Sequence, residues 1–425
     1  RENPYMQYFC GLEEFTDKPI CDSSLLTYVR KRISEEELNN MTVQLLCKQK
    51  QLQEEKLKRE EQEAKDNNED APTPEPEDPN AAAFVDSKGR EHKGVLKADA
   101  TCADAEMRYP VDVDIIHDGC RKVTDYVRKV CEAFGLPKLR TNYKIARKAY
   151  LRLIKQSKKK GKAVRNTIAL MLNYLHKDIR ILLDLLAKDK MYYECLFPYE
   201  KRTLTAIFKM YHQQEEMFRT KTHTCADRIL SIFQPHVRAI VRGKAKAKTE
   251  FGAKIGASIV EGYTFIDHHS WNAYNESQDL SLQIQLFKER FGYLPATILV
   301  DKIYLNKANR DILKELEIQS YCKPLGRPPK EPPSEEMKSK MAKAVGERNE
   351  IECSFGTGKR IYRANDIRAK LPETARCWTG MCYFVKNVMK FLRELCHVLT
   401  EIWHIILFIV TLRGYVSSPQ KAMLS

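Results

Sequence analysis

Hydrophobic residues recur at intervals of three and four over much of the N-terminal half of the chain, which is the spacing of amphipathic helices. Ser34 and Glu37 have the spacing of a capping box, and this predicts the start of one helix. The same period predicts a helix over residues 111–135 and a longer helical stretch over residues 140–240. Residues 51–80 break the pattern. They are rich in Glu, Lys, Gln and Pro, which predicts a solvated helix that frays into a disordered linker.

Strands are predicted on both sides of the long helical stretch. Residues 95–101 have the pattern of a short strand that contains Asp99. After residue 248 the apolar period becomes two, which predicts a hairpin formed by residues 251–260 and 263–266. A continuous apolar run then ends at Asp301, and such runs are typical of strands in sheets that are covered on both faces. Further elements are expected at residues 280–291, 306–316 and 335–360 (helices) and at residues 318–322 (a short strand).

Three acidic residues carry the candidate chemistry. Asp99 and Asp301 each lie on a predicted strand, and Glu352 lies on the last predicted helix. The order of elements around them resembles the ribonuclease-H-like fold, in which the first and fourth strands are neighbours and a late helix packs across them. We therefore expect an α/β fold with a mixed sheet, a helical insertion and a small helical N-terminal domain. Three carboxylates at one sheet edge would supply the oxygen ligands that two Mg²⁺ ions need for phosphoryl transfer.

The last predicted helix presents Glu352 on the same side as Arg348 and Lys359, because each helical residue turns by about 100°. Ile351 and Phe355 form the adjacent apolar stripe that would seat this helix on the sheet. An acid beside two cations suits a site that holds both metal and DNA phosphate. An ordinary surface ion pair is the alternative for Glu352, and a helix cap is the alternative for each aspartate. The competing acids near Asp99 are Asp104, Asp112 and Asp114.

Composition and charge favour a polyanionic partner. The 425 residues have a formal net charge of +15, and each Lys or Arg placed on a phosphate releases condensed counterions. The 13 cysteines are scattered without the spacing of a zinc site, which predicts reduced, mostly buried thiols in a cytosolic protein. The apolar run at residues 405–410 is shorter than the roughly 20 residues of a membrane span. We therefore expect a buried C-terminal helix there and no membrane partner.

Several longer segments resemble DDE transposases of bacterial insertion sequences. The stretch Arg348-x3-Glu352-x6-Lys359 matches the signature around the glutamate of the insertion sequence four and five groups. The segments "EFGAKIGASIVEGYTFIDHHSWNAYNE", "FGYLPATILVDKIYLNKANRDILKELEIQ" and "KPLGRPPK" are similar to one branch of the insertion sequence five family. The segment "QYFCGLEEFTDKPICDSSLLTYVRKRIS" resembles the InsH-type N-terminal domain of those transposases. The resemblance covers about residues 4–393.

The resemblance implies an enzyme that cleaves DNA at the ends of an element and joins the freed 3′-OH to target DNA. The residues that match the family's catalytic and metal-binding acids are Asp99, Asp301 and Glu352, which would hold two Mg²⁺ ions, with Mn²⁺ as a substitute. The residues expected to hold DNA are Arg348, Lys359, Lys302 and Trp271, with a packed core position as the alternative for the tryptophan. The implied partners are terminal inverted repeats, target DNA and a second subunit of a synaptic homodimer. The implied location is the bacterial cytoplasm, in association with the nucleoid.

Two alternatives stay open beside the transposase, namely a hydrolytic metal nuclease of the same fold and an inactive DNA-binding remnant. Val345 stands where the family often has a tyrosine, and Gly356 and Gly358 each weaken the last helix by about 1 kcal/mol. The chain begins without methionine and ends in an unfamiliar tail. These features predict a truncated or decayed copy. A tyrosine recombinase is not indicated, because no tyrosine lies among the arginines and histidines that its chemistry needs.

The sequence predicts a chain of several parts, with the catalytic domain split by an insertion. The insertion contains a basic run at residues 158–165, which is either a solvated face or a DNA contact. The expected parts are a helical DNA-binding domain at residues 1–50, a charged disordered linker at 51–94, the first part of the catalytic domain at 95–139, the helical insertion at 140–245, the rest of the catalytic domain at 246–395, and a C-terminal tail at 396–425.

Overall fold

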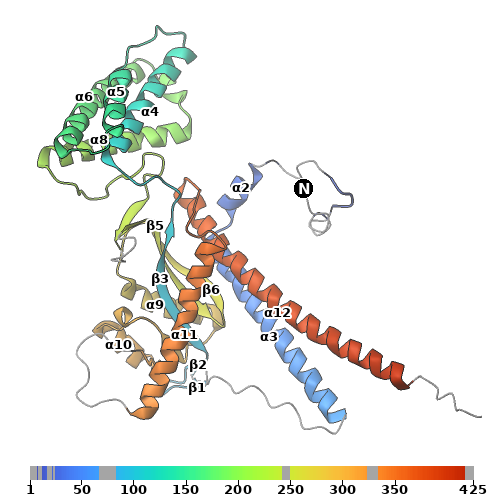
Figure 1. The fold of residues 1–425 in the computed structure, drawn as a ribbon. Coiled ribbons are helices and arrows are strands. Elements are labelled where there is room, and N and C mark those ends of the chain that lie inside the picture. Colours follow the sequence, from blue (N-terminus) through green and yellow to red (C-terminus); the bar gives the residue numbers. More distant parts are fainter. Residues whose placement is uncertain are drawn as a thin grey trace, which may run out of the picture.

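A computed structural model describes Gln7, Asp22 and residues 12–16, 24–66, 83–241, 249–322 and 334–416. The chain has a mixed α/β fold, built from a central sheet, helices on both faces of that sheet, a separate group of helices and a pair of long helices that extends from the body (Figure 1). The "KPLGRPPK" segment and the centre of the predicted linker lie outside the described residues.

The central sheet has five strands of mixed direction. Its middle strand, β3 (Val95–Asp104), pairs antiparallel with β5 (Thr249–Val260) and parallel with β7 (Thr297–Leu299). The far edge of β5 is shared by β4 (Arg238–Val241) and β6 (Tyr263–Ser270), both antiparallel to it. The structure therefore contains the predicted hairpin, which is formed by β5 and β6. It also contains the predicted pairing of the first strand (β3) with the strand that precedes Asp301 (β7).

Two hydrophobic cores cover the two faces of this sheet. On one face, Leu96 and Ala98 of β3 pack with α9 (Leu280–Phe291), η2 (Lys302–Tyr304) and α10 (Lys307–Glu315). The short helix η1 (Glu276–Asp279) contacts α9 and η2. On the other face, residues of β5 pack against α11 (Glu335–Arg360) and the first half of α12 (Pro372–Val416). Gly292 ends α9 with a φ of 84°, a conformation that glycine adopts without strain. The sheet is thus covered on both sides, as the apolar run before Asp301 predicts.

The helical insertion forms a separate group of helices that projects from one end of the sheet (Figure 1). It consists of α5 (Tyr143–Ile154), α6 (Gly161–Leu186), α7 (Lys190–Glu194) and α8 (Pro198–Thr220). Helix α4 (Asp112–Ala133) packs with them, although the predicted boundary at residue 139 assigned it to the catalytic domain. These helices enclose their own hydrophobic core, with Val123, Leu175 and Ile207 fully buried at its centre. The predicted helix at residues 111–135 is α4, and the predicted stretch at 140–240 contains the next four helices.

The N-terminal helices are α2 (Leu25–Arg32) and α3 (Glu35–Asp66). The predicted capping box is confirmed, because the Glu37 backbone N–H donates to Ser34 Oγ (3.1 Å) and the Ser34 N–H donates to Glu37 Oε2 (2.6 Å). Helix α3 lies beside α12 and against β6 (Figure 1). The Asn39 side chain exchanges two hydrogen bonds with the Ile266 backbone, so this helix belongs to the packing of the sheet.

The structure differs from the predicted elements in several places. The predicted linker is ordered at both ends, because residues 51–66 continue α3 and residues 84–92 hold a hairpin of β1 (Phe84–Val85) and β2 (Glu91–His92). Strand β4 lies where a helix was expected. The predicted strand at residues 318–322 contributes only an isolated bridge between Gln319 and Thr297.

The C-terminal helix α12 passes through the expected boundary at residue 396 without a break. The apolar run at residues 405–410 lies within this helix, and the burial of its side chains is outside what the structure describes. Among the described residues, the helices are too short or too polar to cross a membrane.

Candidate active site

Two of the three predicted acids lie side by side because of the register of the sheet. Val95 of β3 pairs with Thr297 of β7, and Lys97 pairs with Leu299, in parallel. Two residues farther along both segments lie Asp99 and Asp301, which the same register places level with each other. Side chains two apart on a strand point to the same face, so both carboxylates continue the face of Lys97 and Leu299.

Asp301 also caps the short helix η2. A helix cap is the alternative to a catalytic role that the sequence left open for this residue. Its Oδ1 accepts a hydrogen bond of 2.7 Å from the Lys302 backbone N–H. The carboxylate remains half-exposed, while Tyr304 one turn later is fully buried. The capping role and a role in the site are compatible, because the cap uses one oxygen of the carboxylate.

Helix α11 brings the third acid to the same face of the sheet. It packs across β3 and β7, and Ile351 and Phe355 are buried in the core beneath it. The Arg348 guanidinium donates to Asp99 Oδ2 (3.3 Å) and to Glu352 Oε1 (2.7 Å). Arg348 therefore joins the acid of the first strand to the acid of the helix. The predicted positions of the apolar stripe and of Arg348 beside Glu352 agree with this packing.

The remaining flank of α11 carries a second ion pair. Glu350 points to the other side of the helix from Glu352, as its angular position predicts, and accepts from Lys97 Nζ at 2.6 Å. Lys97 precedes Asp99 by two positions on the same face of β3. The helix is therefore held over the strand by one ion pair on each flank, with Ile351 buried between them.

The Asp99 carboxyl group is set apart by its surroundings. The pKa of Asp99 is raised to about 6, mainly by burial. The Ala100 N–H and Arg348 lower this pKa, and the nearby carboxylates of Glu276 and Asp301 add smaller contributions that raise it. The ionised form of a carboxyl group that is poorly solvated and close to other negative charges is stabilised when a cation binds next to it. Arg348 supplies that positive charge here.

Sequence reasoning gave no role to Glu276, an acid that acts on the same site. It lies on η1, where its Oε2 pairs with Lys254 Nζ at 2.8 Å, and its charge raises the pKa of Asp99. The only sequence signal was its place at the end of the "SWNAYNE" segment. The pairing of Glu276 with a lysine of β5 depends on how η1 folds back onto the sheet.

The other predicted DNA-binding residues lie at different distances from this cluster. Lys302 is exposed directly after Asp301, and Lys359 is half-buried near the end of α11. Trp271 is packed edge-on against the rings of His236 and His269, with ring centroids 4.3 and 5.0 Å away. The contacts that the structure gives for Trp271 are with this packed group and not with the three acids. This geometry matches the packed-core alternative for Trp271.

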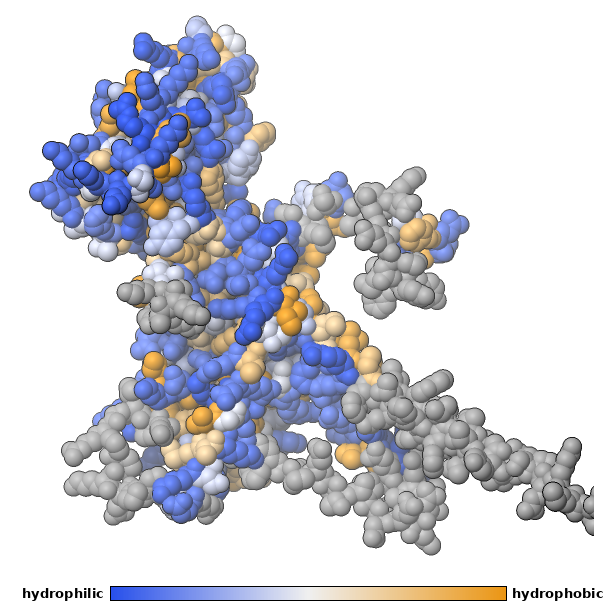
Figure 2. Space-filling model, viewed as in Figure 1, coloured by the Kyte–Doolittle hydropathy of each residue, from blue (hydrophilic) through white to orange (hydrophobic). Residues whose placement is uncertain are grey.

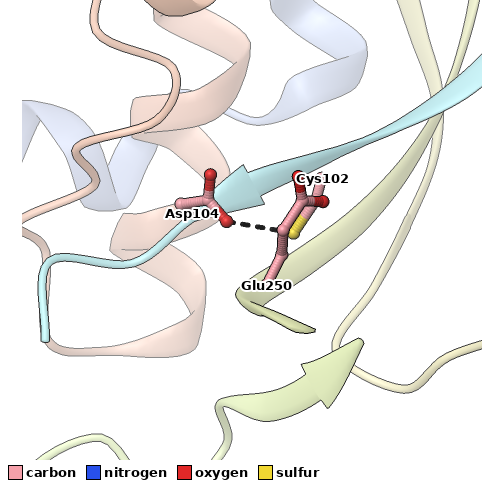
Figure 3. Close-up of side chains that lie close together, drawn as sticks. All are labelled: Cys102, Asp104 and Glu250. Carbon is pink, nitrogen blue, oxygen red and sulfur yellow. Dashed lines mark hydrogen bonds between the residues drawn. The ribbon is translucent and has the colours of Figure 1, made fainter. Parts of the chain in front are cut away.

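A second group of possible ligands lies at the end of β3, where Cys102, Asp104 and Glu250 approach one another (Figure 3). Their ligand atoms lie within 4.8 Å of one another, and the Cys102 thiol donates to Asp104 Oδ1 at 3.5 Å. Burial raises the pKa of this thiol well above its usual range, so the group carries an uncharged sulfur. Mg²⁺ prefers oxygen ligands, so this group suits it less well than three carboxylates do.

The three predicted acids do not approach one another as closely in the described part of the chain, because Arg348 stands between Asp99 and Glu352. The structure thus places Asp99 and Asp301 on neighbouring strands and connects Glu352 to Asp99 through a guanidinium. A metal ion at this site would take the place that Arg348 now fills.

Comparison with known proteins points to the same region. Residues 298–389 match the model of the transposase DDE domain family, and this segment contains Asp301, Arg348 and Glu352. The match supports a DDE transposase, a class of metal-dependent enzymes that process DNA. No curated protein and no solved structure matches the chain.

Proposed function

We propose that the protein is a DNA transposase that cleaves the ends of an insertion sequence and joins the freed 3′-OH to target DNA. The observation that carries this proposal is the register that sets Asp99 beside Asp301, with Glu352 held over the same face of the sheet by α11. The family match covers the second and third of these acids. Asp99 lies outside the matched segment, so its role rests on its geometry.

The residues present fit divalent metal ions. Asp99, Asp301 and Glu352 would hold two Mg²⁺ ions, or Mn²⁺ in their place, because all three offer oxygen ligands and Asp99 is poorly solvated beside other carboxylates. When bound, the metal supplies activation of the attacking oxygen and stabilisation of the leaving oxygen. Burial of Ile351 beneath α11 fixes the position of Glu352 relative to the sheet.

In this proposal, the cations of the site bind phosphates of the DNA. Arg348 would be released from Asp99 and Glu352 once these carboxylates held metal, and its guanidinium would then be free to pair with a phosphate of the element's end. Lys302 and Lys359 add further phosphate contacts. Trp271 was the fourth predicted DNA-binding residue, and its edge-on contacts with two histidines favour the alternative of a packed core position.

We further propose a ribonuclease-H-like core, membership of the insertion sequence five family and an InsH-type N-terminal domain. The mixed sheet with Asp99 and Asp301 on parallel neighbours supports the first of these. The proposed partners are the terminal inverted repeats, target DNA and a second subunit in a synaptic complex within the bacterial cytoplasm. We also propose that a helical insertion divides the catalytic domain, and that it begins with α4 rather than at residue 140, because the separate helical core includes α4 residues such as Val123.

The decisive test is a strand-transfer assay with the DNA that flanks the coding sequence, in Mg²⁺ or Mn²⁺, on the full chain and on Glu352→Gln. Removal of one metal-binding carboxylate should lower cleavage by a factor of about 10³ or more, while DNA binding remains. Glu350→Gln is the matched control, because it makes the same chemical change two residues away on the flank that faces Lys97.

The products separate the three candidate functions. Joined strands from the parent chain, lost in Glu352→Gln and retained in Glu350→Gln, support the transposase. Nicked DNA without joined strands would replace the transposase by a hydrolytic nuclease. DNA binding without any metal-dependent product would replace it by an inactive remnant. Equal loss in both glutamine variants would show that Glu352 has no special role.

A further inference from the structure

A large cavity lies between the helical insertion and the edge of the sheet. Its volume is about 870 Å³, and its walls come from α8, from residues 226–238 that lead into β4, and from residues 370–372 before α12. A cavity of this size accommodates a molecule of the size of a nucleotide or a drug. None of the three proposed metal-binding acids lines it.

The charges around this cavity are mostly positive. Arg202, Lys209, Arg238 and Lys370 line it. Among the described residues of the lining, only Asp227 is acidic, and its carboxylate lies 3.9 Å from the Arg238 guanidinium. Arg202 and Lys209 are exposed on α8, two helical turns apart and therefore on one face. Within the part of the chain that the structure describes, no salt bridge involves Arg202 or Lys209. Their charges are available to an anion.

The inner wall of the cavity is aromatic and apolar. Phe233 is 40% exposed although it is a large apolar side chain, and it lies beside the buried Ile232. His236 also lines the cavity, and its Nε2 is buried without a hydrogen-bond partner in the structure. Burial lowers the pKa of His236 to about 4, so the ring is neutral at pH 7. A flat, polar, uncharged ring is the kind of group that such a wall accepts.

The position of the cavity relates it to the candidate active site through the sheet. Arg238 of β4 pairs with Gly252 of β5, and Gly252 pairs with Asp104 of β3. Asp104 lies five positions beyond Asp99 on the same strand, or roughly 16 Å at about 3.3 Å per residue. The cavity therefore lies two strands away from β3, beyond its Asp104 end, and a DNA strand of a few nucleotides is long enough to span this separation.

We propose that this cavity binds unpaired nucleotides of the DNA substrate, with phosphates on Arg202 and Lys209 and a base against Phe233 and His236. The proposal rests on the proposed function, because it takes DNA as the substrate. Unpaired DNA is favoured over duplex, because paired bases do not expose their faces to an aromatic wall. It is favoured over an acidic peptide, because carboxylates would use the cations and leave the aromatic wall without a partner.

The test is fluorescence anisotropy in EDTA with a labelled oligothymidylate and a labelled duplex of equal length. Arg202→Ala combined with Lys209→Ala should weaken single-strand binding by about tenfold or more at low salt. The matched control is Lys188→Ala combined with Arg219→Ala, which removes two exposed cations of the same insertion outside the cavity. The control pair should change binding by less than about threefold. All four positions are exposed, and melting temperatures verify the fold.

Phe233→Ala separates stacking from charge. It should weaken oligothymidylate binding by about tenfold, within the range of one lost base–aromatic contact, and leave duplex binding unchanged. Equal weakening of both DNA forms in every variant would overturn the proposal in favour of a general phosphate surface. Competition by polyglutamate as effective as by oligothymidylate would overturn it in favour of an acidic peptide.

The binding assay is independent of the cleavage assay, so the two proposals can fail separately. Suppose that the parent chain cleaves DNA and that the double variant Arg202→Ala, Lys209→Ala binds single strands as well as the parent does. This result would overturn the proposed role of the cavity and leave the transposase function standing. Single-strand binding that depends on these residues, in the absence of any cleavage, would support DNA binding by the cavity and contradict the transposase function. Absence of single-strand binding by the parent chain overturns the cavity whatever the cleavage assay shows.

Discussion

In the part of the chain that the structure describes, the sheet and the helical insertion differ in how many of their cations are exposed to solvent without an acidic partner. On the sheet, partly buried acids are held in pairs with cations, as in Asp99 with Arg348 (3.3 Å) and Asp267 with Arg290 (2.7 Å). On the insertion, cations such as Arg202 and those of the basic run at residues 158–165 are exposed to solvent. Figure 2 shows the insertion as a largely hydrophilic surface with scattered apolar side chains. Burial explains the difference. A charge that is removed from water must be paired, whereas a charge in water needs no partner within the fold and stays available to bind a polyanion.

The two regions also differ in what their hydrophobic cores support. The insertion has a core of its own, separate from the two cores that cover the sheet. The core beneath α11 fixes the position of Glu352, while the insertion core fixes only the surface that we assign to DNA. Damage to the first core should therefore affect chemistry, and damage to the second should affect stability and DNA binding.

The largest expected effect separates these two cores. Ile351→Ala and Leu175→Ala each remove a fully buried aliphatic side chain, and each should cost about 2–5 kcal/mol of unfolding free energy. Cleavage per folded molecule should fall by about 100-fold in Ile351→Ala, because the packing that positions Glu352 over the sheet is lost. Cleavage should persist in Leu175→Ala. Denaturant unfolding and a cleavage assay below the melting temperature measure both quantities. Equal loss of cleavage in the two variants would contradict the division between the cores.

A smaller effect is expected from the cation that now neutralises the acids. Arg348→Ala should make the chain bind Mn²⁺ about tenfold more tightly, since no guanidinium has to leave Asp99 and Glu352. Tenfold tighter binding at saturating metal adds about 1.4 kcal/mol, or roughly 1.5 °C, to the metal-induced rise in melting temperature. Arg360→Ala, an exposed arginine at the end of α11, is the control. A smaller metal-induced rise in Arg348→Ala than in the parent would contradict the role of Arg348.

The sheet should also respond to acid through a buried histidine. Burial, aided by Arg376, lowers the pKa of His269 to about 3, so the folded chain keeps this ring neutral while the unfolded chain protonates it below its ordinary value of 6.5. Its stabilising contribution is present above pH 6.5 and is lost as pH falls from 6.5 toward 3. One such group gives a slope of at most about 1.4 kcal/mol per pH unit.

His269→Leu should therefore make the free energy of unfolding less dependent on pH between 6.5 and 4. The slope should decrease without vanishing, because burial also lowers the pKa of His236 to about 4, with the same sign. Denaturant unfolding at several pH values measures the slope. An unchanged slope in His269→Leu would mean that this ring does not contribute to the acid sensitivity of the sheet.

The smallest expected effect concerns the ion pair on the far flank of α11. A double-mutant cycle with Lys97→Met and Glu350→Gln should give a coupling of less than about 1 kcal/mol, since both groups keep contact with solvent. Cleavage should stay near the parent value in Glu350→Gln. A coupling above about 3 kcal/mol would contradict the view that this ion pair is a solvated surface contact.

The sequence by itself determined the elements whose signals are local. The Ser34–Glu37 capping box, the hairpin turn before Tyr263 and the end of α9 at Gly292 follow from side-chain hydrogen bonds and backbone preferences within a few residues. The apolar run before Asp301 indicated a buried strand, and the helical period placed Arg348 beside Glu352. From these, sequence reasoning could bring the three acids to one side of a sheet.

Only the tertiary structure decided the features that depend on contacts between distant segments. The sheet recruits residues 238–241 as β4, although their surroundings have a helical period, because the edge of β5 offers unpaired backbone groups. Glu276 and Arg348 act on Asp99 from η1 and α11, and the cavity between α8 and β4 exists only where the insertion meets the sheet edge. Local periodicity reports how each segment buries its own apolar face. Which charges meet depends on the packing of segments that are far apart in the chain.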